Sequence, residues 1–188
     1  MRSSGSTPSP TTSPSIPVLL WVAGEDHPRA CTGRRLLERK VVRPLPARRP
    51  PRELPVLLDP RSDIPLSRND REACERGGLA GVDCSWNRLG ARGGYPEGPE
   101  WLGRLRERRR LPFLLAGNPQ HYGRLAELNT AEAIAAALYV LGDAAGARSL
   151  LEEFAGSEGF WALNANLLES YANALDAKGV RAAEATFF

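Results

Sequence analysis

The sequence predicts an α/β fold that forms one domain, or one domain with a small appendage. Short apolar runs bounded by glycine and proline lie in the first two thirds of the chain, which is the pattern of strands. Beyond Tyr122 apolar residues recur at helical spacing, and no repeat of 20–50 residues is present. With 188 residues, 42% of them apolar and 25% charged, the chain can bury a core typical of a soluble fold.

Apolar runs and the glycine and proline residues between them predict the first strands and helices. The apolar run at residues 16–23 predicts a first strand, and a basic helix is expected at 34–40, where Thr32 can either cap the helix or hold a ligand carboxylate. Residues 44–55 hold five prolines and several arginines, which exclude regular structure and indicate a connector or an extended strip facing RNA. A second strand is expected at 54–59.

A capping box and a pair of glycines frame the next helix. Ser67 and Asp70 have the Ser-x-x-acid spacing in which side chain and backbone satisfy each other. The helix should run to about Arg76, because Gly77-Gly78 stops it. Residues 79–82 then predict a buried strand.

Two polar segments follow apolar runs. The buried strand at 79–82 leads into Val82-Asp83-Cys84-Ser85-Trp86-Asn87, and a further strand predicted at 111–116 breaks into Gly117-Asn118-Pro119. An open α/β sheet carries its ligand chemistry at the carboxyl ends of its strands. Both segments are therefore expected to converge on one pocket.

The second half of the chain predicts helices. Asn129 and Glu132 are expected to form an N-terminal cap before a helix at 133–141, which is apolar on all sides and so belongs in the interior. A further helix carries apolar residues at i, i+3, i+4 and i+7 from Ala147 and ends at Gly156, and a third is expected at about 160–175.

Composition excludes several classes of protein. No apolar run approaches the roughly 20 residues that cross a bilayer, and residues 1–15 lack an apolar signal region, so they predict a disordered tail and a cytoplasmic protein without a membrane partner. Three widely spaced cysteines and two histidines suggest neither disulfides nor a zinc site, so no metal is expected.

The net charge of +3 is unevenly distributed. Residues 29–52 hold nine basic residues against one acid, and residues 104–110 hold five arginines against Glu107, whereas residues 125–188 hold three basic and nine acidic side chains. Such a field attracts a polyanion, although surface solvation or ion pairing with the acidic half is the plainer explanation. Two basic runs beside candidate pockets favour RNA.

A family resemblance appears once these motifs are assembled. The chain resembles the S-adenosylmethionine-dependent aminocarboxypropyltransferases of small-subunit (16S/18S) ribosomal RNA, and it is more similar to the archaeal type, which lacks a long acidic tail. The blocks that carry the resemblance lie in one order from about residue 31 to 171: Cys31-Thr32-Gly33, Leu58-Asp59-Pro60, Leu66-Ser67 with Asp70, the Val82 to Asn87 block, Arg110-Leu111-Pro112, Ala116-Gly117-Asn118-Pro119 with Tyr122-Gly123, Glu132-Ala133, and Asn164 with Leu167-Leu168 and Tyr171. Ala126 departs from it, standing where an aromatic residue is expected, as does Gly156-Ser157, where the family usually has Trp-Gly.

The resemblance implies a fold and a domain order that periodicity alone would not give. It implies a SPOUT-like α/β fold with a deep C-terminal trefoil knot. Residues 16–53 would form a small N-terminal α/β domain, and residues 54–188 the SPOUT-like catalytic domain that binds the cofactor. Because the apolar pattern leaves no face that demands a dimer, a monomer is expected.

The resemblance also implies a reaction, transfer of the 3-amino-3-carboxypropyl group from S-adenosylmethionine to N3 of a hypermodified uridine, N1-methylpseudouridine, in small-subunit rRNA or a pre-ribosomal particle. The cofactor's sulfonium activates three carbons, so its orientation decides which group leaves. Two alternatives stay open: a SPOUT-type RNA methyltransferase, and a non-catalytic rRNA-binding protein of ribosome assembly.

Roles for single residues come from the same resemblance. Asp83 is a candidate base or proton relay for the uridine imide, but it can equally cap its loop or orient the cofactor's ammonium group. Trp86 would pack near the methyl and sulfonium, unless it is an ordinary core tryptophan. Thr32 would hold the cofactor carboxylate, and the backbone of Val82 would meet the ribose. Leu111 and Ala126 would frame the adenine through main-chain groups, and Thr130 would line the same pocket. The residues expected to bind rRNA phosphates are Arg34, Arg35, Arg61, Arg68, Arg108, Arg109 and Arg110.

Overall fold

The computed structural model describes residues 13–23, 31–83 and 98–188, and it confirms an α/β fold. Within this part of the chain a five-stranded sheet has the order β2-β1-β4-β3-β5, and every neighbouring pair is parallel. The strands are β1 (Val18–Val22), β2 (Arg43–Pro44), β3 (Val56–Leu58), β4 (Leu79–Asp83) and β5 (Arg108–Arg109).

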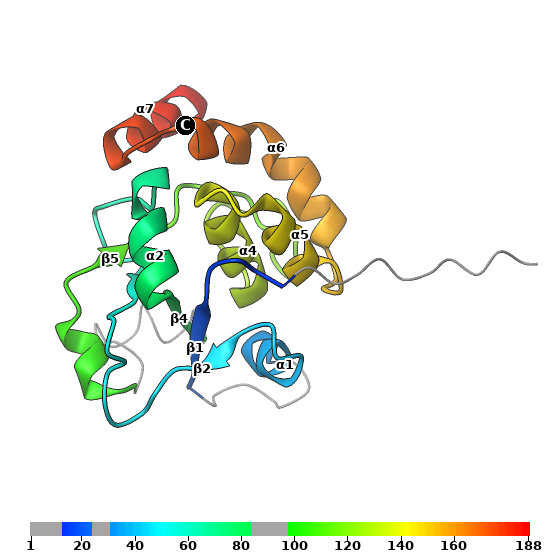
Figure 1. Cartoon of the computed structure of the whole chain (residues 1–188). Coiled ribbons are helices and arrows are strands. Elements are labelled where there is room, and N and C mark those ends of the chain that lie inside the picture. The colour runs from blue at the N-terminus through cyan, green and yellow to red at the C-terminus, as the bar shows by residue number, and fades with distance from the viewer. Residues whose placement is uncertain (1–12, 24–30, 84–97) are drawn as a thin grey trace, which may run out of the picture.

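Helices join the early strands and make up most of the second half. They are α1 (Thr32–Glu38), the 3-10 turn η1 (Arg68–Asp70), α2 (Arg71–Gly77), the 3-10 helix η2 (Glu100–Arg104), α4 (Thr130–Val140), α5 (Ala144–Leu151), α6 (Ser157–Asn173) and α7 (Ala177–Phe187). Figure 1 shows α4 and α5 between the strands and the outer pair α6 and α7. The second half thus stacks onto the sheet in successive layers of helices.

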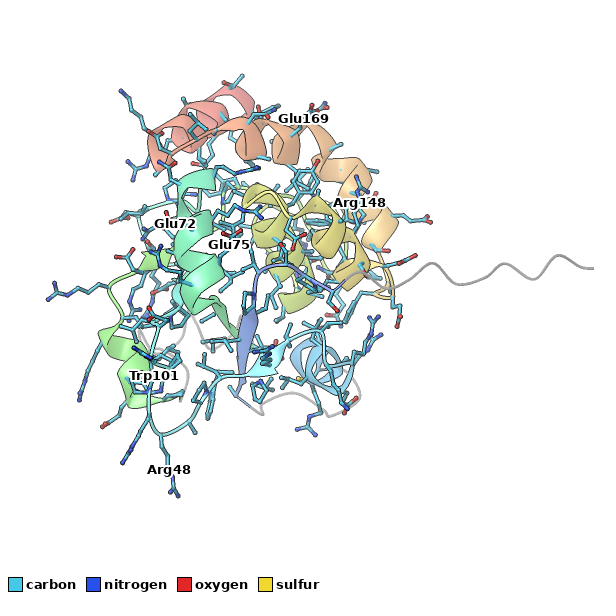
Figure 2. The ribbon with its side chains drawn as sticks, viewed as in Figure 1. Arg48, Glu72, Glu75, Trp101, Arg148 and Glu169 are labelled. Atoms are coloured by element: carbon cyan, nitrogen blue, oxygen red, sulfur yellow. The ribbon has the colours of Figure 1, made fainter. Side chains whose placement is uncertain are left out.

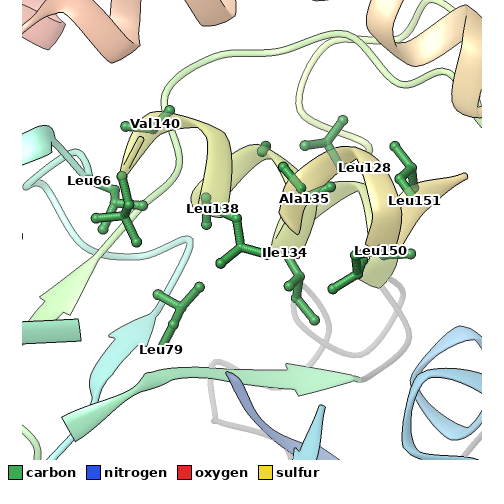
Figure 3. Close-up of a cluster of buried hydrophobic side chains, with 14 of the residues drawn as sticks. Leu66, Leu79, Leu128, Ile134, Ala135, Leu138, Val140, Leu150 and Leu151 are labelled. Atoms are coloured by element: carbon green, nitrogen blue, oxygen red, sulfur yellow. The ribbon is translucent and has the colours of Figure 1, made fainter. Parts of the chain in front are cut away.

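Strand residues alternate between two apolar clusters, one on each face of the sheet. Leu20, Val56 and Leu79 belong to the larger cluster, which α1 and α4 complete, while Leu57 and Ala80 face a smaller one. Figure 3 shows the larger cluster, in which Ile134 and Leu138 of α4 lie between Leu79 of β4 and the leucines of α5. The expected interior position of this helix is confirmed, because eight of its residues are buried.

A small cluster on the opposite face fixes the basic connector. Trp101 of η2 packs with Leu45 and Leu57, and its indole Nε1 donates to the carbonyl of Pro46 at 3.0 Å. Figure 2 shows Trp101 and Arg48 on the same side of the molecule, away from α6 and α7. Residues 45–55 have no regular structure, as expected, but Pro44 ends the two-residue strand β2, where a parallel edge position tolerates proline.

The topology creates a crevice between β1 and β4. From β1 the chain next enters the sheet at β2, on one side, whereas from β4 it next enters at β5, on the other side. Adjacent strands whose connections run in opposite directions leave a gap outside their carboxyl ends, which is where open α/β sheets bind ligands. Val22 pairs with Asp83 at this edge of the sheet, so Asp83 stands at the mouth of the crevice.

The strand predicted at 111–116 is wrong. The edge strand is β5, and residues 111–116, which follow it along the chain, form only an isolated bridge, Leu115 to Leu125. Side chains of the helices replace a neighbouring strand: the amide of Asn164 bonds both the backbone N–H and the carbonyl of Leu115 at 2.8 Å. Leu114 and Ala116 of this segment are buried, and its backbone hydrogen bonds go to side chains of α6 and α7 and to the backbone of residues 123–126.

Helix starts differ from the expected ones by a few residues, and one helix was not expected. The capping boxes of Ser67 with Asp70 and of Asn129 with Glu132 are confirmed. Thr32 does not cap α1, because the Cys31 sulfur accepts the Arg34 N–H at 3.4 Å and Thr32 opens the first turn. The unexpected helix α7 packs its Glu184 against Arg110 through two hydrogen bonds of 2.6 and 2.8 Å.

None of the helices in the described ranges has both the length and the apolarity that a bilayer crossing requires. Most of the tail expected at residues 1–15 lies outside the described residues, since only residues 13–15 of it are placed. Strands from both sides of the expected boundary at residue 53 share the one sheet.

Gly117 gives a direct test of how tightly the extended segment meets α6. A Cβ at this position would lie 2.3 Å from the backbone nitrogen of Phe160. We expect Gly117→Ala to lower the free energy of unfolding by about 1–3 kcal/mol, because backbone must move to admit it. Chemical denaturation of both proteins measures the change.

The matched control is Gly103→Ala in η2, where a new Cβ meets nothing within 4 Å. Its effect should stay within roughly 0.5 kcal/mol, as for most surface substitutions. Equal destabilisation by the two substitutions would contradict the close packing of residue 117 on α6.

Candidate functional site

A cavity of about 510 Å³ lies at the carboxyl ends of the strands, where the topology leaves its crevice. Its size is within the range of small-molecule and cofactor sites. Six residues that the sequence singled out line it together: Thr32, Val82, Asp83, Leu111, Ala126 and Thr130. Trp86, the remaining cofactor-site candidate, lies outside the described residues. The expectation that the 82–83 and 111–118 segments share one pocket is confirmed.

Asp83 ends β4 and is held by two helix starts. Its Oδ2 accepts the Gly33 N–H of α1 at 3.0 Å and the Cys31 thiol at 3.0 Å, and its Oδ1 accepts the hydroxyl of Thr130 at the start of α4. The side chain is buried, with 8% of the residue exposed. A carboxylate in this position ties three distant segments of chain together.

Glycine at position 33 is required by this arrangement. A Cβ there would lie 2.3 Å from Oδ2 of Asp83 and 2.7 Å from its carboxyl carbon. Only a residue without a side chain lets the backbone N–H approach the carboxylate. The Thr32-Gly33 pair thus brings the start of α1 against the end of β4, and Thr32 lines the pocket beside it.

The opposite wall comes from two backbone segments joined by hydrogen bonds. The N–H of Ala126 donates to the carbonyl of Leu114 at 2.8 Å. Ala126 and Leu111, which lies three residues before Leu114, both line the cavity. Ala126 has a φ of 61°, in the left-handed region that non-glycine residues seldom occupy. Such backbone is held only when its surroundings determine it, and here it turns residues 126–130 along the cavity.

A buried glutamate sets the loop that closes this wall. Glu132, 1% exposed, accepts the Asn129 N–H in the capping box, the Gly117 N–H at 2.9 Å and the Asn118 side-chain amide at 2.8 Å. A charged group is rarely so buried without full hydrogen bonding. Glu132 therefore fixes the Gly117-Asn118 turn relative to α4.

Asp59 directly follows β3 and lines the pocket at the carboxyl end of this strand. Its carboxylate accepts from Arg108 at 2.7 Å and from the backbone and side chain of Arg61 at 3.0 and 3.3 Å. Burial by itself raises the pKa of Asp59, but the hydrogen bonds from Arg108 and Arg61 outweigh it and hold the pKa below its ordinary value. Asp59 is therefore ionised at neutral pH and serves these arginines.

The arginines expected to bind RNA fall into two groups. The first group bonds within the protein: Arg61 and Arg108 to Asp59, Arg109 to Asp70 and Glu107, and Arg110 to Glu184. The second group lies on the surface, where Arg35 stacks at 4.6 Å over the Phe154 ring, and Arg34 and Arg68 are exposed. The distinction is not visible in the sequence, because both groups stand in basic runs.

His121 and Glu127 are among the pocket residues that the sequence did not predict. They line the cavity, and the imidazole Nδ1 of His121 contacts the Glu127 carboxylate. The His121 hydrogen bond, which outweighs the opposing effect of burial and is assisted by Arg124, holds the pKa of Glu127 below its ordinary value. The two residues lie on separate turns of one loop, at a spacing without helix or strand periodicity, so no pattern pointed to them.

The pocket suits a ligand with both apolar and polar parts. Leu58, Leu111 and Ile134 give apolar walls, while Thr32, Asn118 and Thr130 bring polar groups. Within the described ranges no cluster of three or more histidine, cysteine, aspartate or glutamate side chains could hold a metal ion. These residues fit a nucleoside cofactor with an amino-acid arm.

The sequence is similar to a family model and to named rRNA-modifying relatives. Residues 56–188 match the family model described as "Ribosome biogenesis protein, C-terminal". The chain is 38% identical over 167 residues to the 16S rRNA aminocarboxypropyltransferase of Methanosarcina acetivorans, covering 88% of this chain and 90% of that protein. It is 36% identical to the 18S rRNA aminocarboxypropyltransferase of Schizosaccharomyces pombe over 90% of this chain, but it spans only 56% of that relative's length.

A solved structure gives the same fold. The S-adenosylmethionine-dependent rRNA acp-transferase Tsr3 from Vulcanisaeta distributa superposes with a TM-score of 0.72 at 29% identity, over 91% of this chain and 97% of that one. The family model covers well over half of this chain, and the archaeal relative is matched over nearly its whole length. The chain therefore belongs to the 16S/18S rRNA aminocarboxypropyltransferase family.

Proposed function

We propose that this protein transfers the 3-amino-3-carboxypropyl group of S-adenosylmethionine to N3 of N1-methylpseudouridine in small-subunit rRNA during ribosome biogenesis. One observation carries the proposal: the six cofactor-site and catalytic candidates within the described residues line one cavity at the switch point of the sheet. Membership of the family supports the same reaction.

The cofactor-binding roles follow from the family resemblance, and the residues that would carry them line the cavity. Thr32, at the start of α1 and in the cavity wall, would hold the amino-acid carboxylate. The backbone of Val82 would meet the ribose, main-chain groups of Leu111 and Ala126 would frame the adenine, and Thr130 would line the same pocket. When bound, S-adenosylmethionine supplies a sulfonium-activated aminocarboxypropyl group. Trp86 remains a proposed neighbour of the methyl group.

Asp83 is better placed to position the site than to accept a proton. It already accepts three hydrogen bonds, from Gly33, Cys31 and Thr130. Three of the roughly four acceptor positions of the carboxylate are therefore in use, and only a second position on Oδ1 is left for the uridine imide proton. The arrangement therefore supports Asp83 as the anchor that fixes Thr32 and Thr130, with proton acceptance as the alternative that experiment can separate.

Phosphate binding by arginine completes the proposal. Arg34 and Arg68 are exposed, and Arg34 lies two residues after Thr32 in the first turn of α1. The exposed guanidinium of Arg34 beside a cavity residue suits an RNA backbone, whereas that of Arg68 lies next to Gly142, beyond the C-terminal end of α4, and would bind RNA farther from the cavity. Arg61, Arg108, Arg109 and Arg110 make internal ion pairs, so their contribution to RNA binding would have to come from the donors that these pairs leave over.

Several finer features belong to the proposal as well. These are the SPOUT-like deep trefoil knot, the division into residues 1–15, 16–53 and 54–188, a monomeric state and a cytoplasmic location. Pre-ribosomal particles would be the partner. Threaded chains are rare, and chain tracing through the loops that join β3, α2 and α4 would decide the knot.

The reaction class is tested with S-adenosylmethionine carrying a label either in the carboxyl carbon or in the methyl group. With small-subunit rRNA that contains N1-methylpseudouridine, we expect only the carboxyl label to enter RNA, since only that carbon belongs to the transferred arm. Scintillation counting of purified RNA measures both. Entry of the methyl label alone would indicate a methyltransferase. If neither label enters the RNA, the protein is a non-catalytic RNA-binding protein.

Asp83→Asn separates positioning from proton acceptance. The new amide group faces donors, and the Gly33 N–H cannot turn to accept from it. An unsatisfied buried donor costs about 1–3 kcal/mol, so we expect cofactor affinity to fall about tenfold and the transfer rate to fall with it. Calorimetric binding and single-turnover rates measure the two effects.

Thr130→Ser is the matched control for Asp83→Asn, because it keeps the hydroxyl that bonds Asp83 and should behave as the unaltered protein. A much lower rate in Asp83→Asn with unchanged cofactor affinity would instead favour proton acceptance. Unchanged rate and affinity would remove both roles.

Reversing the charge of the exposed arginines tests the role of these side chains in RNA binding. For the double variant Arg34→Glu and Arg68→Glu, we expect weaker RNA binding of every sequence. The slope of log Kd against log salt should fall by about one for each phosphate that the variant no longer binds. Arg76→Glu on α2, an exposed arginine outside the proposed RNA-binding surface, is the control. A slope unchanged from the parent protein would exclude both arginines.

A further inference from the structure

Two phenylalanine rings stand exposed at one edge of the cavity. Phe113 lines the cavity and is 39% exposed, and Phe188 is 58% exposed. Their ring centroids lie 5.9 Å apart with the planes at 75°, an edge-to-face contact. We name this pair the aromatic rim. Because burying such a ring is worth about 1.5–3 kcal/mol, rings left in solvent beside a binding site require an explanation.

The backbone of Phe113 is held from both sides. Its N–H donates to Oε1 of Glu184 at 3.1 Å, and its carbonyl accepts the hydroxyl of Tyr171 at 3.0 Å. Tyr171 is fully buried and Glu184 is 6% exposed, so α6 and α7 supply rigid partners. The ring therefore projects from a fixed point.

The same helix side chain organises the rest of the rim. Glu184 also binds Arg110 through both carboxylate oxygens, and the Arg110 guanidinium lies 5.1 Å from the centre of the Phe113 ring. Phe188 follows α7 directly, and its N–H donates to the carbonyl of Glu184 at 3.0 Å. One buried glutamate thus places both rings and a cation at the pocket edge.

We propose that the aromatic rim stacks the base of a nucleotide adjacent to the target uridine in single-stranded rRNA. This inference rests on the proposed function, which brings a nucleobase into the cavity. A base that enters an enzyme pocket leaves its stack, and its neighbour is then without a stacking partner. Exposed aromatic rings beside the cavity replace that partner. They can stack on any base, because every nucleobase has a π-face.

The test combines protein variants with altered RNA. The probe is a synthetic stem-loop with N1-methylpseudouridine in its loop, and two further versions carry an abasic residue on the 5′ or the 3′ side of it. Binding is measured by fluorescence anisotropy for the full chain and for Phe113→Leu, Phe188→Leu and the double variant. Leucine keeps apolar bulk but removes the ring.

We expect one of the two abasic RNAs to bind the unaltered protein about tenfold more weakly than intact RNA. The double variant should bind intact RNA about tenfold more weakly than the unaltered protein does. It should bind that same abasic RNA with the affinity that it has for intact RNA. Leu175→Ala, which trims a side chain that is 71% exposed and outside the rim, should leave affinity unchanged. Additive effects of the double variant and the abasic residue, or equal affinity of all three RNAs for the unaltered protein, would overturn the proposal.

Two further readouts keep the result clear. Phe188 does not line the cavity, so Phe188→Leu should weaken RNA binding while cofactor affinity stays at the parent value. Transfer of the carboxyl label to intact RNA by the unaltered protein reports on the proposed function separately. If transfer is normal but the effects of the double variant and the abasic residue on RNA binding are additive, the stacking proposal is wrong and the proposed reaction stands. If transfer is absent but these effects are non-additive, the proposed reaction is wrong and stacking on the aromatic rim is supported.

Discussion

The site depends on the carboxylate of Asp83, which joins the end of β4 to the starts of two helices. Its two oxygens accept from Gly33, Cys31 and Thr130, residues that lie about 50 positions away on either side along the chain. Buried charge is costly unless it is fully hydrogen-bonded, and here the bonds also set where α1 and α4 begin. Thr32 and Thr130 face the same cavity because one acid holds both helix starts.

The second wall shows how helices can substitute for a strand. Residues 111–118 run extended along the pocket, and their backbone groups are satisfied by Asn164 and Tyr171 of α6, Glu184 of α7 and Glu132 of α4. Each of these side chains is buried. The C-terminal helices therefore shape the cavity although only α4 contributes residues to its lining.

Charge in this protein serves structure as well as recognition. The run from Arg104 to Arg110 suggested a phosphate-binding surface, yet three of its arginines reach across to Asp59, Asp70 and Glu184. Asp59 and Asp70 lie within the basic part of the chain itself, whereas Arg110 with Glu184 and Arg39 with Glu153 pair it with the acidic residues 125–188, as the plainer explanation of the charge asymmetry anticipated. In our proposals, recognition is left to exposed arginines such as Arg34 and Arg68, and to aromatic rings at the pocket edge.

Local sequence determined much of the fold. Apolar runs predicted β1, β3 and β4, and two capping boxes predicted the starts of η1 and α4, since these features depend on neighbours within a few residues. The Asp-Cys-Ser-Trp-Asn and Asn-Pro segments carried much of the family resemblance, and the resemblance in turn named six residues that line the pocket. Only tertiary structure decided which chain satisfies the 111–116 backbone, which arginines are paired, and that His121, Glu127 and Phe113 meet the cavity. These outcomes depend on contacts between residues far apart in the chain, and no local pattern encodes them.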